Sequence, residues 1–182
     1  MTSKLIILDR DGVINEDSDE YIKSPDEWIP IPGSLEAIAR LNRAEYRVLV
    51  ASNQSGLARG YFDYDTLSQI HEKMHRMLAV FGGRVDAVYF CPHGPDDHCQ
   101  CRKPKPGLFE DIARRTKSDL TGVPAVGDSL RDLDAARALK CAPVLVRTGK
   151  GKATEAKGKG LDDVPVYDDL ASYVADLLAR DG

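Results

Sequence analysis

Two aspartates stand one residue apart near the start of the chain, directly after a short apolar run. Residues 4–12 read Lys-Leu-Ile-Ile-Leu-Asp-Arg-Asp-Gly, so Asp9 and Asp11 follow the hydrophobic residues at once. A short apolar run of this kind predicts a buried strand, and ligands of open α/β sheets bind beyond the carboxyl ends of the strands. Two carboxylates this close repel each other unless a cation, a proton or a basic side chain intervenes. The pair therefore predicts a metal or phosphoryl site.

Polar side chains follow two further apolar runs in the same way. Ser52-Asn53-Gln54-Ser55 comes directly after residues 47–51, and Gly127-Asp128 comes directly after residues 123–126. The carboxyl ends of neighbouring parallel strands meet at one edge of a sheet. We therefore expect these side chains, distant in the sequence, to converge on the site of the two aspartates.

Such a group of side chains suits the hydrolysis of a phosphate monoester. One carboxylate attacks phosphorus to form an aspartyl-phosphate, and the other protonates the departing alkoxide and then activates water. Repulsion between a carboxylate and a phosphate charge is on the order of 4 kcal/mol at 4 Å in an effective dielectric of 20, and Mg²⁺ would offset it. Asp9 and Asp128 are candidate magnesium ligands. Lys103 and the Ser52 hydroxyl are candidate donors to the phosphoryl oxygens.

Three of the four cysteines are crowded into eleven residues and form, with a histidine, the set Cys91, His93, Cys99 and Cys101. In a reducing compartment such a cluster indicates metal binding rather than disulfides. Three thiolates and one imidazole suit a structural Zn²⁺ whose four positions are all closed. His98 is a competing ligand, but its use would leave His93 without a role. Zinc would order the loop at about 91–103, position Lys103 and aim Arg102 at the substrate.

Apolar runs of strand length alternate with runs of helical periodicity along the whole chain. This alternation predicts an α/β fold, a Rossmann-like, mostly parallel sheet with helices on both faces and no large cap domain. Ser34 is expected to cap the first helix and an aspartate at 168 or 169 the last one, and residues 149–160 are expected to form a mobile loop. Strands are expected at 4–8, 47–51, 86–91, 123–126, 143–147 and 164–167, and helices after Ser34 and at 65–81, 107–117, 130–139 and 170–179.

The composition excludes several other classes of protein. The chain has 182 residues, 42% of them hydrophobic and 30% charged, and its net charge of −4 gives no electrostatic case for a nucleic-acid partner. No stretch approaches the ~20 apolar residues of a membrane span, and the N-terminus lacks a signal-peptide pattern. We expect one cytoplasmic domain over residues 1–182, a monomer without a membrane partner. Cys141, apart from the cluster, is expected to be a buried apolar side chain.

Four short motifs in order resemble those of the haloacid-dehalogenase-like phosphatases: Asp9-Arg10-Asp11-Gly12, Ser52-Asn53, Lys103 and Gly127-Asp128. The resemblance spans nearly the whole chain. It implies that Asp9 is the nucleophile and that Asp11 is the general acid and base. It also implies that Mg²⁺ is held by Asp9, by the backbone carbonyl of Asp11 and by Asp128. Asp132 is a lesser candidate, since it would serve equally well as a solvated helix residue.

The cysteine loop narrows the resemblance to one family of sugar phosphatases. Cys-Pro-His…Cys-x-Cys-Arg-Lys-Pro-x-Pro-Gly, together with Ser-Asn-Gln-Ser-Gly-x-Ala-Arg-Gly at 52–60, is similar to the D-glycero-D-manno-heptose-1,7-bisphosphate 7-phosphatases. The substrate would be a small phosphorylated sugar, a precursor for lipopolysaccharide, and Arg102 would bind its non-reacting phosphate. Ser129 stands where some members of the family carry a lysine. The implied substrate contacts are Asp17, Ser18 and Asp19 in the segment near 17–21, and Asn53, Gln54, Ser55, Arg102, Lys103 and Ser129.

Three alternatives to this interpretation stay open. Histidinol-phosphate phosphatases share the zinc loop, so their reaction is the second enzymatic hypothesis. A receiver-type signalling module also combines acidic residues, a hydroxyl and a lysine on a parallel sheet, but it would lack the proton donor at Asp11 and the zinc loop. A zinc-stabilised binding protein without catalysis is the third alternative. The anomer of the heptose substrate is left undecided.

Overall fold

The computed structural model describes residues 4–182 and contains one six-stranded sheet in the order β3-β2-β1-β4-β5-β6. Every neighbouring pair of strands is parallel, and the register aligns Ile6 with Val48 and Leu8 with Val126. This is the predicted Rossmann-like arrangement. The strands are β1 (Lys4–Leu8), β2 (Tyr46–Asn53), β3 (Ala87–Cys91), β4 (Pro124–Gly127), β5 (Ala142–Val146) and β6 (Val166–Tyr167).

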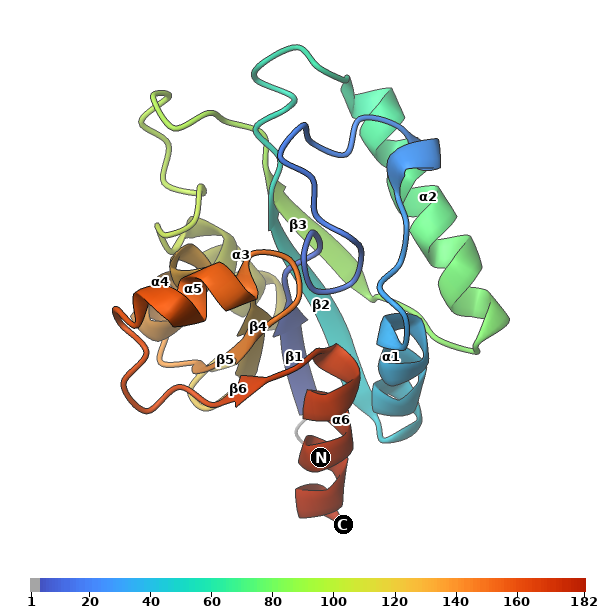
Figure 1. Cartoon of the computed structure of the whole chain (residues 1–182), viewed down its shortest axis with the longest axis vertical. Helices are drawn as coiled ribbons and strands as arrows, with labels where there is room; N and C mark the ends of the chain where they lie inside the picture. Colours follow the sequence, from blue (N-terminus) through green and yellow to red (C-terminus); the bar gives the residue numbers. More distant parts are fainter. Residues whose placement is uncertain (1–3) are drawn as a thin grey trace.

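Helices cover both faces of the sheet because successive side chains of each strand point to opposite faces. In β1, Ile6 and Leu8 belong to one core cluster, and Leu5 and Ile7 belong to the other. The first cluster includes apolar residues of α1, α2 and α6, and the second includes those of α3 and α4 (Figure 1). The helices are α1 (Ser34–Arg43), α2 (Tyr64–Val80), α3 (Gly107–Thr116), α4 (Leu130–Ala138), α5 (Gly151–Lys157) and α6 (Leu170–Asp181), with a 3₁₀ turn at η1 (Pro25–Glu27).

The chain order places a topological switch between β1 and β4. From β1 the chain builds outward through β2 and β3, and it then returns to β4 on the other side of β1. Loops that leave neighbouring strands in opposite directions open a crevice at their carboxyl ends. In Figure 1 the loops that follow β1, β2 and β3 gather at the top of the view, over this edge. They are loops rather than a folded layer, as expected for a chain without a large cap domain.

Two local predictions were wrong. Ser34 does not cap α1: the cap is Gly33, at φ +86°, and the Ser34 hydroxyl instead donates to the Val13 carbonyl oxygen at 2.9 Å. Residues 149–160 are not a mobile loop throughout, because α5 occupies Gly151–Lys157. Its Glu155 accepts two hydrogen bonds from the Arg147 guanidinium, at 2.7 and 2.9 Å, which ties α5 to the end of β5.

The remaining expectations for the elements hold to within a few residues. β2 is longer than predicted and β6 is shorter. Asp169 caps α6, accepting from the Ser172 N–H at 2.7 Å, and Cys141 is buried. Within residues 4–182 no helix is both long enough and apolar enough to cross a bilayer.

Candidate active site

A pocket of about 270 Å³ lies at the carboxyl ends of β1 and β4, where the sheet topology switches. It collects residues from five segments of the chain: 9–21, 53–55, 102–103, 128–132 and Lys150. Eleven of the predicted site residues line it: Asp9, Asp11, Asp17, Ser18, Asp19, Asn53, Ser55, Arg102, Lys103, Asp128 and Ser129. Tyr21, Arg131, Asp132 and Lys150 complete the lining.

Asp9 is the first residue beyond β1, and its backbone is still attached to the sheet through a 2.9 Å hydrogen bond from its N–H to the Val126 carbonyl. One carboxylate oxygen, Oδ1, accepts from the Arg10 N–H at 2.8 Å and from Lys103 Nζ at 3.1 Å. Burial and the nearby Asp132 charge raise the pKa of Asp9 to about 7, although Lys103 opposes the shift. An additional positive charge at this point would favour the ionised, nucleophilic form.

Lys103 is at the C-terminal end of the cysteine loop, and its side chain extends into the site. Its ammonium donates to the Ala51 carbonyl at 2.6 Å and lies 2.7 Å from Asp132 Oδ1, besides its contact with Asp9. Its side chain is only 3% exposed. Burial by itself lowers the pKa of Lys103, but the charges of Asp132 and Asp9 outweigh it and hold the pKa above its ordinary value. The ammonium is therefore a fixed positive charge beside Asp9.

Asn53 has a role that the sequence did not suggest. Its amide oxygen accepts from the Lys103 N–H at 3.0 Å, and its amide nitrogen donates to the Lys103 carbonyl at 3.1 Å. The Asn53 side chain, at the end of β2, thus binds both the N–H and the carbonyl of the Lys103 backbone. Asn53 was predicted to contact substrate; it lines the pocket, but both polar atoms of its side chain are already paired with this backbone.

Asp11 is held by three donors. Oδ1 accepts from Arg10 Nε at 2.8 Å and from Asn15 Nδ2 at 2.9 Å, and Oδ2 accepts from Gln54 Nε2 at 3.4 Å. Burial raises the pKa of Asp11, but the Arg10 charge and these hydrogen bonds outweigh it, and the pKa falls below its usual value. Asp11 is therefore ionised in the free protein and would take up a proton only when negative charge arrives beside it.

Two predicted residues, Ser52 and Gln54, lie behind the pocket rather than in its lining. Both are buried, and Gln54 Nε2 donates to the Ser52 hydroxyl oxygen at 2.8 Å as well as reaching Asp11. In this arrangement the Ser52 hydroxyl proton stays available for another acceptor, because the hydroxyl oxygen is used as an acceptor here. Gln54 itself orients both Ser52 and Asp11.

Arg10 stands between the two aspartates in the sequence, and its fully buried side chain connects Asp11 to helix α2. Its Nη1 lies 3.1 Å from His71 Nε2. A guanidinium can only donate, so His71 must accept through Nε2 and carry its proton on Nδ1. Burial and the Arg10 charge lower the pKa of His71 to about 3, which keeps the imidazole neutral. Nothing in the sequence near residue 71 indicated this contact.

Asp128 and Asp132 complete the acidic group. Asp128 Oδ2 accepts from the Lys150 N–H at 2.9 Å, and burial together with the charges of Asp9 and Asp132 raises its pKa to about 9. Asp132 is buried and not a solvated helix residue: Oδ2 accepts from the Asp128 and Ser129 N–H groups and from the Ser129 hydroxyl, and Oδ1 faces Lys103. Both oxygens of Asp132 are thus paired, while Asp128 keeps one oxygen free of protein donors.

These carboxylates fit a divalent cation. Oxygens of Asp9, Asp128 and Asp132 lie within 4.8 Å of one another, and hard oxygen ligands are those that Mg²⁺ prefers. The raised pKa values of Asp9 and Asp128 are a sign of acidic charge that Lys103 alone does not neutralise. Since Asp132 is bound to Lys103 and Ser129, the residues that would hold the cation are Asp9 and Asp128. The backbone carbonyl of Asp11 stays a predicted third ligand.

Glycines allow the chain to pass close to Asp128. Gly12, at φ +86°, and Gly149, at φ +56°, adopt a backbone conformation that favours glycine. A Cβ atom at either position would overlap Asp128 Oδ2. The loop after β1 and the loop before α5 therefore meet over this carboxylate.

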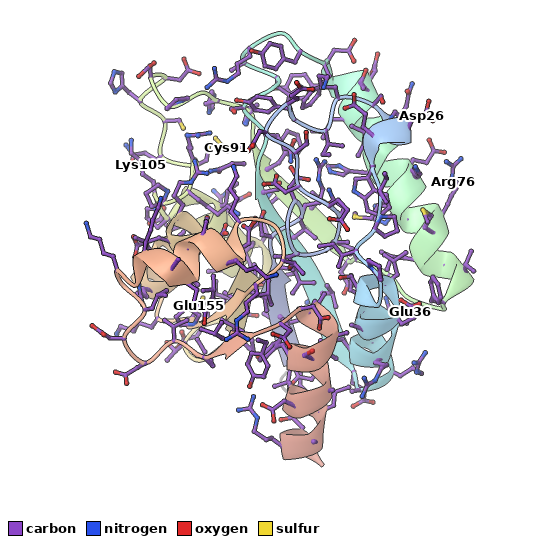
Figure 2. All side chains as sticks on the ribbon, in the orientation of Figure 1. Asp26, Glu36, Arg76, Cys91, Lys105 and Glu155 are labelled. Atoms are coloured by element: carbon purple, nitrogen blue, oxygen red, sulfur yellow. The ribbon has the colours of Figure 1, made fainter. Side chains whose placement is uncertain are left out.

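The four predicted zinc ligands lie together in space, with Cys91 at the end of β3 and the other three in the loop that follows it. The Sγ atoms of Cys91 and Cys101 are 2.9 Å apart, and His93 Nδ1 lies 3.4 Å from Cys101 Sγ. One ligand atom from each of Cys91, His93, Cys99 and Cys101 lies within 4.8 Å of the others, and His98 is outside the group. The cysteines are free thiols, and three thiols with one imidazole fit tetrahedral zinc. Figure 2 shows Cys91 on the same side of the molecule as Lys105, which follows the loop.

Comparison with known proteins agrees with this geometry. Residues 4–132 match the family described as Polynucleotide kinase 3 phosphatase, and residues 100–173 match the HAD-hydrolase-like family. A Bordetella bronchiseptica protein named D-glycero-beta-D-manno-heptose-1,7-bisphosphate 7-phosphatase is 63% identical over 96% of this chain and 98% of its own. The protein of the same name from Pseudomonas aeruginosa is 55% identical over 98% and 99%. The chain belongs to the haloacid-dehalogenase-like phosphatases.

Solved structures of this family show how closely the fold agrees. The D,D-heptose 1,7-bisphosphate phosphatase of B. bronchiseptica, crystallised with magnesium and phosphate, superposes with a TM-score of 0.96 at 62% identity, covering 97% of this chain and 99% of the other. The D,D-heptose 1,7-bisphosphate phosphatase of Burkholderia thailandensis superposes with a TM-score of 0.78 at 50% identity, covering 97% of this chain and 99% of the other. The resemblance seen in the motifs is thereby confirmed across nearly the whole chain.

Besides His71, two residues that line the pocket, Arg131 and Lys150, were not predicted from the sequence to belong to the site. Arg131 is in the first turn of α4, two residues after Ser129. Lys150 stands in the segment taken for a mobile loop, and its ammonium lies 3.7 Å from Asp17. Of these residues, only Arg131 could have been predicted from the sequence. It lies in the first turn of a helix that directly follows the strand-end Asp128, and such a turn lies beside the site.

Proposed function

We propose that the chain removes the 7-phosphate of D-glycero-β-D-manno-heptose 1,7-bisphosphate by Mg²⁺-dependent hydrolysis through an aspartyl-phosphate on Asp9. The observation that carries the proposal is the convergence of Asp9, Asp11, Lys103 and Asp128 on one pocket. The choice of sugar and of the β anomer rests on the activity for which the relatives that share more than half of this sequence are named.

The first half of the reaction uses Asp9 as nucleophile. A carboxylate oxygen of Asp9 bonds to phosphorus as the bond between phosphorus and the sugar oxygen breaks. Asp11 gives a proton to that departing oxygen, having gained the proton when the phosphate charge raised its pKa. Lys103 faces Asp9 at 3.1 Å and is placed to donate to a phosphoryl oxygen. Bound by Asp9 and Asp128, magnesium would supply the positive charge that lets an anionic carboxylate approach an anionic phosphate.

The second half releases phosphate and restores the protein. Asp11, now ionised, takes a proton from a water molecule that attacks phosphorus. The bond between phosphorus and Asp9 breaks, and Asp9 regains its carboxylate. Asp11 loses the proton that it took from water when phosphate leaves, because its pKa then returns to the lowered value of the free protein. Arg10, Asn15 and Gln54 hold Asp11 in place throughout, since all three donate to its oxygens.

The zinc loop has a supporting part in the proposal. Zn²⁺ held by the four ligands would fix the loop that ends in Arg102 and Lys103. Asn53 already grips the Lys103 backbone, so the loop and β2 together determine where the ammonium lies. We propose a structural rather than a catalytic role for this metal, because protein ligands would close all four positions.

Histidinol phosphate is the second candidate substrate. Asp17 and Asp19 line the pocket, and their carboxylates would attract the ammonium group of this monoester. A receiver-type module has no support in the family matches, and the paired Asp9 and Asp11 fit turnover rather than phosphate storage.

The test is phosphate release by the purified, zinc-loaded chain in the presence of MgCl₂. We expect kcat/KM to be highest for the β anomer of heptose 1,7-bisphosphate, lower for the α anomer and far lower for histidinol phosphate. Asp9→Asn should abolish release while the circular dichroism spectrum stays that of the wild type. Preference for histidinol phosphate would replace the proposed substrate, and undiminished release by Asp9→Asn would remove Asp9 as nucleophile.

A further inference from the structure

A second cavity of about 290 Å³ adjoins the catalytic pocket. Arg102, Lys103 and Arg131 line both hollows and therefore form the wall that they share. The rest of the second cavity comes from the zinc loop and the residues after it: Gly94, Pro95, His98, Cys99, Pro104 and Lys105. In Figure 2 this part of the molecule is marked by Cys91 and Lys105.

The charges of the two hollows differ sharply. Six aspartates line the catalytic pocket, whereas the second cavity has no carboxylate among its described lining residues. Its charged side chains are Arg102, Lys103, Lys105 and Arg131, all of them cationic. A cavity with this lining attracts an anion and disfavours a cationic or neutral group.

The two arginines in the shared wall have unused donors. Within residues 4–182, Arg131 makes no hydrogen bond and no ion pair, and the guanidinium of Arg102 has a single long contact, 3.4 Å to the His93 carbonyl. Lys103, by contrast, is bound to Asp9, Asp132 and Ala51, and Lys105 donates to the Cys99 carbonyl at 2.7 Å. The arginines are therefore the groups that remain for a ligand.

Both arginines are attached to parts of the site that are already fixed. Arg102 directly precedes Lys103, whose backbone is gripped by Asn53. Arg131 directly precedes Asp132, which is buried and bound to Lys103 and to the Asp128 and Ser129 N–H groups. An anion held by the two guanidinium groups would thus be placed at a defined distance from the reacting phosphate.

We propose that Arg131 joins Arg102 in a clamp for the second, non-reacting phosphate of a sugar bisphosphate. The clamp lies at the wall between the two hollows while the reacting phosphate lies at Asp9 and Lys103. Planar guanidinium groups bind phosphate oxygens in pairs, so two of them suit a phosphate dianion. The inference rests on the proposed bisphosphatase function and adds Arg131 as a residue that determines the choice of bisphosphate over monophosphate.

The experiment compares heptose 1,7-bisphosphate with heptose 7-phosphate, which differ only in the phosphate that does not react. Arg131→Gln should lower kcat/KM for the bisphosphate roughly tenfold to a hundredfold, the usual effect of losing one charged hydrogen-bonding partner. The same variant should change kcat/KM for the monophosphate less than twofold. Arg131→Lys should recover part of the loss, since it keeps the charge but not the paired geometry.

Arg76→Gln is the matched control, because Arg76 is an exposed arginine of α2 on the far side of the molecule (Figure 2). It changes the net charge equally and should leave both substrates unaffected. An equal loss on both substrates in Arg131→Gln, or no loss on either, would overturn the clamp while wild-type turnover of the bisphosphate upheld the proposed function. A wild-type chain that does not hydrolyse the bisphosphate would overturn the proposed function, and the clamp with it.

Discussion

Lys103 stands between two carboxylates, Asp9 and Asp132, in a place that water hardly reaches. Breaking a buried ion pair by removing one partner is costly, because the remaining charge is left without compensation. Here one ammonium compensates for two aspartates, and one of these, Asp9, is the proposed nucleophile. Stability and reactivity therefore depend on the same atom.

Replacing Lys103 with Met tests this dependence. We expect kcat to fall by about 10²- to 10³-fold, as for the loss of a group that stabilises developing negative charge. We also expect the free energy of unfolding to fall by about 3–5 kcal/mol. Lys152→Met is the control, since Lys152 is exposed on α5. Steady-state kinetics and urea denaturation measure the two effects, and a variant as active as the control would show that Lys103 is dispensable for the reaction.

At the scale of residues, the sequence could predict which side chains come together in the site but not which hydrogen-bond partners hold them there. Asp9, Asp11, Lys103 and Asp128 were predictable because each follows a strand or a motif at a fixed spacing. The contact between Arg10 and His71 was not, because it joins residues 61 positions apart through the packing of α2 against the loop after β1. The substrate contacts predicted for Asn53 and Gln54 stay predictions, and the sequence did not indicate that their amides bind Lys103, Ser52 and Asp11.

At the scale of elements, strands were easier to predict than the segments that follow them. A buried parallel strand needs an uninterrupted apolar run, which the sequence shows plainly. α5 was missed because its seven residues, Gly-Lys-Ala-Thr-Glu-Ala-Lys, have no apolar stripe. It is held instead by polar contacts: Arg147 with Glu155, and the Thr154 hydroxyl with the Asp128 carbonyl at 2.8 Å. Such contacts appear only once the fold has brought β4 and β5 together.

The loop after β3 is the element whose order we expect to depend most on a ligand. Between Cys91 and the start of α3 it has no helix or strand, and its ligand group comes from both ends of an eleven-residue span, Cys91 to Cys101. Burial opposes the thiolate of Cys99, but hydrogen bonds from the Arg102 backbone and neighbouring cysteines lower its pKa to about 6. A thiol that ionises this readily is a good zinc ligand at neutral pH.

Replacing Cys101 with Ser should therefore release zinc and loosen residues 91–103. We expect a loss of bound zinc from about one ion per chain, faster amide exchange in this loop, and a fall in kcat/KM of about tenfold or more because Lys103 is less well placed. His98→Asn, at a residue of positive φ that Asn tolerates, should retain the metal. Elemental analysis and hydrogen exchange measure both variants; full zinc in Cys101→Ser, or its loss from His98→Asn, would contradict the ligand set.

At the scale of the whole molecule, the site joins the two halves of the sheet. Asp9 follows β1, while Asp128 and Asp132 follow β4 on the other side of the switch point. Gly12 and Gly149 bring a loop from each half together over Asp128. Charge repulsion at this seam acts on the stability of the entire fold, because the carboxylates cannot separate without opening the sheet edge.

The pH dependence of stability should reveal this repulsion. Burial and nearby carboxylates raise the pKa of Asp128 to about 9, while in the unfolded chain an aspartate ionises near pH 4. Between pH 7 and 9 the unfolded state therefore binds fewer protons than the folded state, so stability falls as pH rises. For the zinc-loaded, magnesium-free chain we expect this group to contribute a loss of about 2 kcal/mol over the two units, or roughly 4–8 °C in Tm.

Asp128→Asn isolates the contribution, because Asn keeps the carbonyl that can accept from the Lys150 N–H but does not ionise. The decline in Tm between pH 7 and 9 should be smaller in this variant than in the wild type, because the carboxyl that releases its proton over this range is gone. Adding Mg²⁺ should raise the Tm of the wild type more at pH 9 than at pH 7, since protons then no longer compete for the carboxylates, and should have little effect on Asp128→Asn. Equal slopes of Tm against pH in the two proteins would mean that ionisation of Asp128 costs the folded state no stability. Asp9 and Asp128 would then need no cation to offset their repulsion where the two halves of the sheet meet.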